Sequence, residues 1–202
     1  MKHATTLLSA TLALSAQLAT AQMRIDPAAT RLRGTVEKVD ARQVTVKSVE
    51  GTSSTAKLAS DTTYAVRTPA TLTDIKPGDF VASAAVKGKD GKLHSTELRI
   101  FPEALRGLGE GQRPMAAPDT MMTNATVSAV VVPPSEVVVP PEGRVLKVKY
   151  KEGDSELVVG PEVQIVKLVP TPLSELKVGT EVTVIANKAA DGSLTAQLIN
   201  AN

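Results

Sequence analysis

The chain has 202 residues, and its 23 Lys and Arg against 21 Asp and Glu leave a formal net charge of only +2 at pH 7. Nucleic-acid-binding proteins usually concentrate basic residues on one face, whereas both signs are interleaved here, so nucleic acid is not an expected partner. Aromatic residues make up 2% of the sequence, with no Trp and no Cys. This leaves little for stacking on bases or sugar rings, and nothing for disulfide bonds.

The N-terminus has the pattern of a secretory signal peptide over residues 1–21. Lys2 and His3 precede an uncharged, largely apolar run over residues 4–18, and Ala19-Thr20-Ala21 supplies small residues for cleavage after Ala21. A membrane anchor is the alternative, but the run is short for ~30 Å of hydrocarbon. We therefore expect a periplasmic mature chain that begins at Gln22, has a tail over residues 22–30 and contains no transmembrane segment.

A repeat follows. The stretch TLTDIKPGDFVASAAVKGKDGKL begins at Thr71, and PLSELKVGTEVTVIANKAADGSL begins at Pro172; the two align without a gap when Pro69 is laid on Pro170. The spacing is too long for a solenoid repeat and indicates two copies of one small domain. We expect these copies to occupy residues 31–101 and 124–202.

Each copy has the pattern of short strands. β-Branched and apolar residues alternate with polar ones at Val44 and Val46, at Leu146, Val148 and Tyr150, and at Val182, Val184 and Ala186. Asp90-Gly91 and Asp191-Gly192 predict hairpin turns. About five strands and one helical turn per copy predict an all-β fold of two tandem OB-like barrels. Phe80 leaves two alternatives open, because it faces either a neighbouring module or its own barrel core after a bulge.

The connector over residues 102–123 is rich in Gly and Pro. Charged side chains occur in it at short spacing, namely Glu103, Arg106, Glu110 and Arg113, and three glycines alternate at Gly107, Gly109 and Gly111. A Gly-rich loop flanked by Arg can hold an anion with its backbone amides. The alternative, which we favour, is an ordered strap whose Arg and Glu pair with each other or with barrel carbonyls.

The second copy contains a Pro-flanked arm over residues 133–143. Pro pairs at both of its ends favour extended backbone. Between them lie Val137, Val138 and Val139. The arm is either a stiff segment packed on the other barrel or a partner-binding edge, since exposed apolar extended segments often mark interaction sites.

Several segments together resemble a known family. RGTVEKVD, LTDIKPGDFV, DGKL, FPEALRGLGEGQRP and MTNATV are similar to bacterial periplasmic proteins with repeats of the DUF5666 kind. The resemblance covers nearly the whole mature chain and implies a signal peptide and two OB-like β-barrel modules, but it brings no activity. The chain departs from the family pattern within the connector, where Gln112, Met115 and Ala116 replace an expected His, Trp and Asp.

The residue types also limit the chemistry. Past the signal peptide the chain has one histidine, His94, and no Cys, so we expect no nucleophile–base pair, no metal site and no cofactor. We expect a non-enzymatic module that binds a periplasmic protein or a small anionic ligand. In it Arg106 and Arg113 would face the anion, and Glu103 and Glu110 would orient them. A metal-handling accessory protein or an enzyme that uses connector carboxylates is the alternative.

Overall fold

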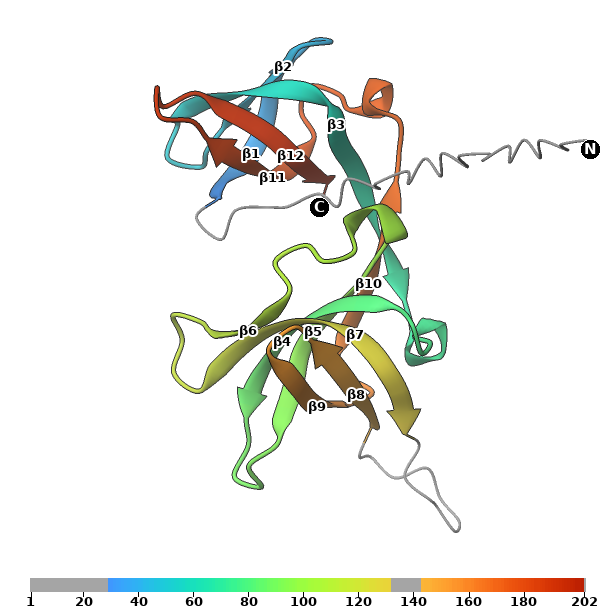
Figure 1. Ribbon diagram of the computed structural model, residues 1–202. Coiled ribbons are helices and arrows are strands. Elements are labelled where there is room, and N and C mark those ends of the chain that lie inside the picture. The colour runs from blue at the N-terminus through green and yellow to red at the C-terminus, as the bar shows by residue number, and fades with distance from the viewer. Residues whose placement is uncertain (1–28, 132–142, 202) are drawn as a thin grey trace, which may run out of the picture.

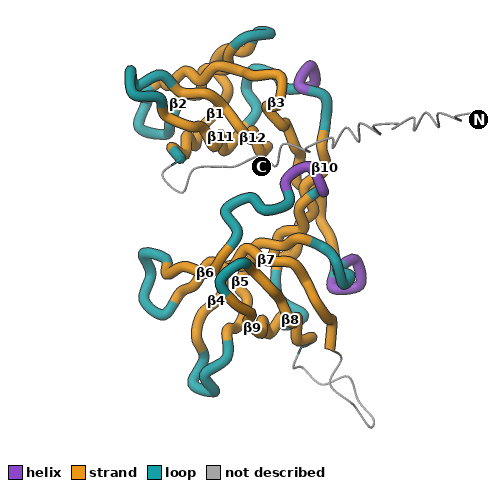
Figure 2. Tube along the Cα trace, in the orientation of Figure 1, coloured by secondary structure: helices purple, strands orange, loops and turns teal. Residues whose placement is uncertain are grey.

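The computed structural model describes residues 29–131 and 143–201. These residues form an all-β structure with 64% strand and no α-helix, and none of its helical turns is long and apolar enough to cross a membrane. The strands are β1 (Thr30–Val39), β2 (Gln43–Lys47), β3 (Ser53–Ala70), β4 (Phe80–Lys87), β5 (Leu93–Phe101), β6 (Gly111–Pro114), β7 (Thr120–Val131), β8 (Arg144–Tyr150), β9 (Gly153–Val159), β10 (Gln164–Pro170), β11 (Glu181–Lys188) and β12 (Leu194–Ala201). Three 3₁₀ turns lie between them: η1 (Leu72–Asp74), η2 (Glu103–Leu105) and η3 (Leu173–Glu175) (Figure 2).

The strands gather into two groups, one above the other in Figure 1. The upper group, formed by β1, β2, the first part of β3, β12 and β11, closes into a five-strand mixed barrel. Only the β12–β3 pairing is parallel. Alternating residues of each strand point inward, and the core contains Val36, Val44, Val46, Val182, Val184 and Ile199.

The lower group is formed by β4, β5, β7, β8 and β9. Its antiparallel pairings run from β5 through β4, β7 and β8 to β9. The ring of pairings is completed by a short parallel contact of β5 with β9, at Leu93↔Leu157 and His94↔Val158. A second core fills this group, with Val81, Leu98, Val127, Leu146 and Leu157 fully buried.

The division of the strands between the groups differs from the expected tandem barrels at 31–101 and 124–202. Strands β1–β3 do not close with β4 and β5 of their own copy; they close with β11 and β12 of the other copy. The cause lies in β3, which continues without interruption to Ala70 while its second part pairs with β10, from Ala65↔Pro170 to Ala70↔Ile165. Pro69 favours extended backbone at Thr68. The chain therefore leaves the upper group, and its next hairpin enters the lower one.

The two copies nevertheless make equivalent contacts. The β12–β3 register includes Leu198↔Thr63, and the β10–β5 register includes Gln164↔Glu97. The offset that lays Pro69 on Pro170 converts each of these pairs into the other. The molecule thus has internal pseudo-two-fold symmetry in which the C-terminal hairpins of the copies are exchanged, as in a domain-swapped dimer.

A third apolar cluster joins the two groups. It contains Ala65, Phe80, Leu105, Leu108, Leu168 and Leu198. Phe80 therefore faces the neighbouring group and not the core of its own group, and its ring lies 5.6 Å from that of Phe101. The predicted hairpin turns are present, with Gly91 and Gly192 at φ 77° and 83°, in the left-handed region that glycine adopts readily.

Candidate anion-binding site

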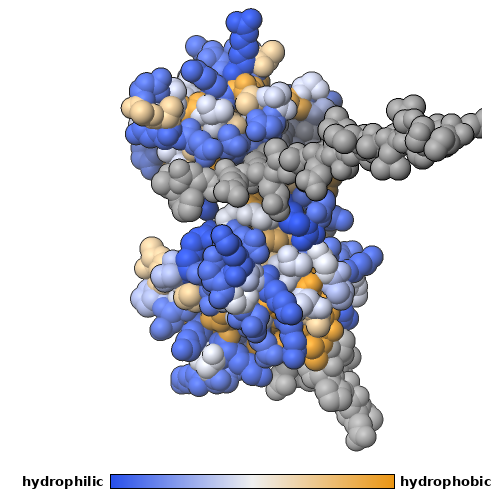
Figure 3. Space-filling view, in the orientation of Figure 1, coloured by the Kyte–Doolittle hydropathy of each residue, from blue (hydrophilic) through white to orange (hydrophobic). Residues whose placement is uncertain are grey.

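A cleft of about 900 Å³ lies between the two strand groups. Residues from both copies line it, on β1, β3 and β5 of the first copy and on β7, β10, β11 and β12 of the second. The outer face in Figure 3 is dominated by hydrophilic side chains over both groups. A cleft of this size is at the upper end of the range for small-molecule sites.

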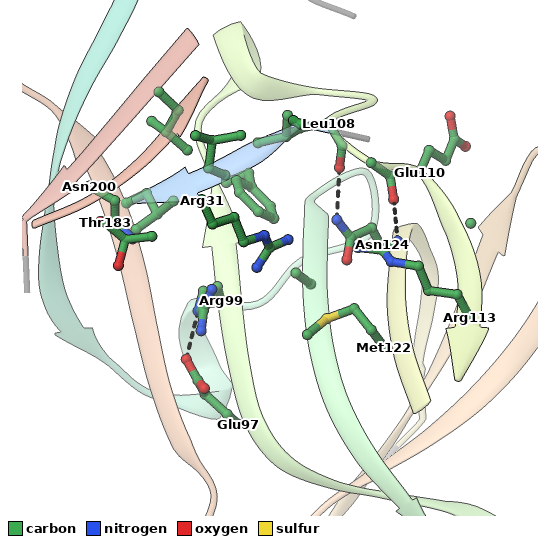
Figure 4. Close-up of a pocket in the computed structure, with 18 of the residues that line it drawn as sticks. Arg31, Glu97, Arg99, Leu108, Glu110, Arg113, Met122, Asn124, Thr183 and Asn200 are labelled. Atoms are coloured by element: carbon green, nitrogen blue, oxygen red, sulfur yellow. Dashed lines mark hydrogen bonds and ion pairs between the residues drawn. The ribbon is translucent and has the colours of Figure 1, made fainter. Parts of the chain in front are cut away.

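Arginines are the main charged residues in the cleft. Five line it: Arg31 and Arg33 on β1, Arg67 on β3, Arg99 on β5 and Arg113 on β6. Arg31 and Arg33 lie on one side of β1 because side chains alternate along a strand. Figure 4 shows Arg31 and Arg99 pointing into the same space. Three glutamates, Glu97, Glu110 and Glu152, also line the cleft, so positive charge is in excess.

Only part of this positive charge is compensated within the chain. Arg99 Nε lies 2.6 Å from Glu97 Oε1, and Arg113 Nη1 donates a hydrogen bond to the Gly109 carbonyl at 2.9 Å. Arg31 and Arg67 form no ion pair with any residue in the described parts of the chain. The charged neighbours of Arg31 are all arginines, whereas Arg67 has the Glu97 carboxylate near it as well as Arg99 and Arg33.

The pKa values follow this arrangement. Burial, followed by the charges of Arg113, Arg33 and Arg99, lowers the pKa of Arg31. Burial also lowers the pKa of Arg67, and Arg99 adds to this while Glu97 opposes it. Burial disfavours the Glu97 carboxylate, but Arg99 and the neighbouring guanidiniums outweigh this and lower the pKa of Glu97. Charged forms in the cleft are thus held partly desolvated and close to like charges, which is typical of binding sites.

Unpaired polar atoms are concentrated in the same place. Four buried side-chain polar atoms have no hydrogen-bond partner within the described residues, and three of them belong to residues lining the cleft: Arg67 Nε, Asn124 Oδ1 and Asn200 Oδ1. The fourth is Asn187 Oδ1. Buried polar groups are normally paired, so three orphans in one cleft require an explanation.

Some of these arginines and asparagines lie in two rows of register partners that run across neighbouring strands. On the upper group, register partners on β1, β11 and β12 are Arg33, Thr183 and Asn200. On the lower group, register partners on β7, β4 and β5 are Asn124, Ala82 and Arg99. All six line the cleft. Pseudo-symmetry relates the rows, and each presents one arginine and one asparagine on strands two apart.

No protein-family model, no curated protein and no solved structure matches the chain. The resemblance to DUF5666 proteins accordingly stays a prediction.

The connector residues predicted to form one site lie in two places. Glu110 and Arg113 line the cleft. Arg106 lies elsewhere, and Glu103 holds it with two contacts of 2.6 Å. Arg106 also donates hydrogen bonds to the Gly78 carbonyl at 2.8 Å and to Thr126 Oγ1 at 3.3 Å. Arg106 therefore fastens the connector to the lower group, as the strap interpretation describes.

Other predicted residues contribute less. Val137, Val138 and Val139 lie outside the described residues, as does the predicted signal peptide. His94 is exposed and its Nε2 lies 3.0 Å from Asp90 Oδ2. Gln112 lines the cleft, where its Nε2 donates to Thr123 Oγ1 and Ser155 Oγ. In residues 29–131 and 143–201, no three His, Cys, Asp or Glu side chains gather closely enough to hold a metal ion.

The roles of Arg31, Arg33, Arg67 and Arg99 in lining the cleft were not predicted from the sequence. A signal was present in the repeat: arginines of the first copy align with neutral residues of the second, such as Arg67 with Leu168 and Arg99 with Asn200. Charges present in only one of two otherwise similar copies are not needed for the shared fold. Such positions are candidates for binding.

Proposed function

We propose that this chain is a non-enzymatic binding module, exported to the periplasm, whose cleft holds a small anionic ligand. The observation that carries the proposal is Arg67, which lines the cleft, has a buried Nε without a partner, and has Arg99, Glu97 and Arg33 as charged neighbours. A buried donor without an acceptor is costly. A bound anion would supply the missing acceptor.

Guanidinium groups suit this role. They stay protonated, and their planar donors form paired hydrogen bonds to phosphate, sulfate or carboxylate. Five of them around one cleft would bind an anion with more than one acidic oxygen better than a halide. In this proposal Arg113 keeps its predicted ligand-facing role, while Arg106 has a structural one.

The proposal includes the finer structural prediction that both strand groups are OB-like modules. The equivalent registers of the two groups and the resemblance to DUF5666 proteins support it. The periplasmic location is supported by the N-terminal sequence pattern. The alternative of a metal-handling accessory protein or an enzyme has less support, because Glu103, one of its carboxylates, is already held by Arg106.

Calorimetric titration of residues 22–202 with pyrophosphate at low ionic strength tests the proposal. We expect saturable one-to-one binding that Arg67→Gln weakens at least tenfold. Arg42→Gln, at an exposed turn outside the cleft, is the matched control and should bind as the unmodified chain does. Absence of binding, or equal weakening by both substitutions, would contradict the proposal.

A further inference from the structure

We infer that the ligand is an anionic saccharide, that is, a sugar bearing a phosphate, sulfate or carboxylate group. The inference rests on the proposed anion site and adds what the two asparagines of the cleft require. Arginines account for the acidic group, since they offer only donors. Asn124 Oδ1 and Asn200 Oδ1 are acceptors without partners, so they need donors from the ligand.

The orientation of Asn124 is fixed by the chain. Its Nδ2 donates a hydrogen bond of 2.7 Å to the Leu108 carbonyl, which leaves the buried Oδ1 as the end of the amide without a partner. The side chain is 6% exposed and lies on the cleft lining beside Arg113 (Figure 4). A buried amide held at one end and unpaired at the other is a preformed acceptor.

Asn200 supplies a second unpaired amide oxygen, on the other wall of the cleft. It is 5% exposed, lines the cleft and has an unpaired Oδ1. Its register partner Thr183 separates it from Arg33. A buried amide oxygen without a donor destabilises a fold, and a leucine of similar size would avoid that cost, so ligand recognition explains why an amide is present.

The spacing defines the size and kind of ligand. Each wall places an arginine and an asparagine two strands apart, which is about 10 Å at the usual strand separation. A bare phosphate cannot reach both. A sugar ring with an acidic substituent spans this distance and presents hydroxyl donors along it, so hydrogen bonds and not aromatic stacking would hold the ring. A cationic donor group is disfavoured, because arginines outnumber glutamates in the cleft.

Calorimetry with three probes separates this inference from the anion site itself. The probes are glucose 6-phosphate, methyl phosphate and glucose, titrated into residues 22–202. We expect glucose 6-phosphate to bind about tenfold more tightly than methyl phosphate, as one or two additional hydrogen bonds would give, and glucose alone to bind weakly. Equal affinity for the two phosphates would overturn the saccharide inference and leave the anion site standing. If neither phosphate nor pyrophosphate binds, the proposed function fails as well.

Two substitutions test whether Asn200 causes the preference for glucose 6-phosphate over methyl phosphate. Asn200→Leu removes one of the two unpaired oxygens and should therefore lower the ratio of glucose 6-phosphate affinity to methyl phosphate affinity. Asn187→Leu removes the fourth orphan oxygen, which lies outside the cleft, and should leave the ratio as it was. If the ratio of the two affinities is the same in Asn200→Leu as in the unmodified chain, Asn200 does not bind the sugar hydroxyls and the inference is wrong.

Discussion

Arg67 and Leu168 lie directly opposite each other in the antiparallel pairing of β3 with β10, and they occupy equivalent positions in the two copies of the repeat. An antiparallel pair of equivalent residues marks the point where a two-fold axis crosses a strand pair. The pseudo-axis therefore passes through the cleft, which both residues line. The exchange of hairpins between the copies is what creates a cleft lined by both.

Replacing Arg67 by leucine makes this central pair apolar. We expect Arg67→Leu to raise the free energy of unfolding, by about 1 kcal/mol, because it removes a desolvated charge beside like charges. The same substitution should abolish pyrophosphate binding. Thermal unfolding in low-salt buffer without multivalent anions, together with calorimetry, measures both. A clear fall in melting temperature would show that Arg67 serves the fold.

Substitution of Arg106 should have the opposite effects, namely lower stability and unchanged pyrophosphate affinity. Arg106→Gln loses the Gly78 carbonyl contact and the pair with Glu103, so we expect a loss of stability of about 1 kcal/mol. Pyrophosphate affinity should stay within twofold, because Arg106 does not line the cleft. Denaturant unfolding and calorimetry test the pair of outcomes. If Arg106→Gln instead lowers pyrophosphate affinity and leaves the stability unchanged, the anion site lies at Arg106 in the connector and not in the cleft.

The stability at acid pH should depend on Glu103. Its hydrogen bond and ion pair with Arg106 lower the pKa of Glu103 below its ordinary value of 4.5. A carboxyl whose folded-state pKa is lowered stabilises the fold above the unfolded-state value, and this contribution is lost as pH falls through the folded-state pKa. Glu103→Gln should therefore flatten the fall in melting temperature below about pH 4.5. If the melting temperature of Glu103→Gln falls below pH 4.5 as steeply as that of the unmodified chain, the Glu103–Arg106 pair contributes nothing measurable to stability.

Gly109 tests the connection between the connector loop and Asn124. Its φ is 56°, and a Cβ there would lie 3.3 Å from Asn124 Nδ2. Gly51 also has positive φ, 87°, but a Cβ there would meet nothing within 4 Å. Both Gly→Ala substitutions should cost about 1 kcal/mol of stability for the backbone conformation. Only Gly109→Ala should also weaken pyrophosphate binding, which calorimetry on both variants would reveal. If the two variants bind pyrophosphate with equal affinity, the connector loop at Gly109 does not contribute to the anion site.

The local structure was predictable from the sequence, and the division between groups was not. The alternation at Val44, Val46, Val182 and Val184 correctly gave buried strand faces. Because both copies carry the same pattern, a hairpin buries the same faces whether its partner strands come from its own copy or from the other. Periodicity alone therefore cannot show whether a hairpin joins the strands of its own copy or those of the other copy.

The cleft could not be predicted for a related reason. Arg33, Arg67 and Arg99 are far apart in the chain, and only the exchanged pairing brings β1, β3 and β5 around one space. The charge interleaving that argued against a basic surface is correct for the chain as a whole. The interleaving along the chain does not reveal the local excess of arginine over glutamate in the cleft, because most glutamates lie outside the cleft.

Arginine Nε–Hε resonances, followed by NMR during titration with pyrophosphate, test the anion cleft most directly. We expect the signals of Arg31, Arg33, Arg67 and Arg99 to shift along one binding curve, with Arg67 changing most because its Nε has no partner within the described residues. Arg42 and Arg106 should remain in place. Shifts confined to Arg106, or small uniform shifts of every arginine, would contradict the account.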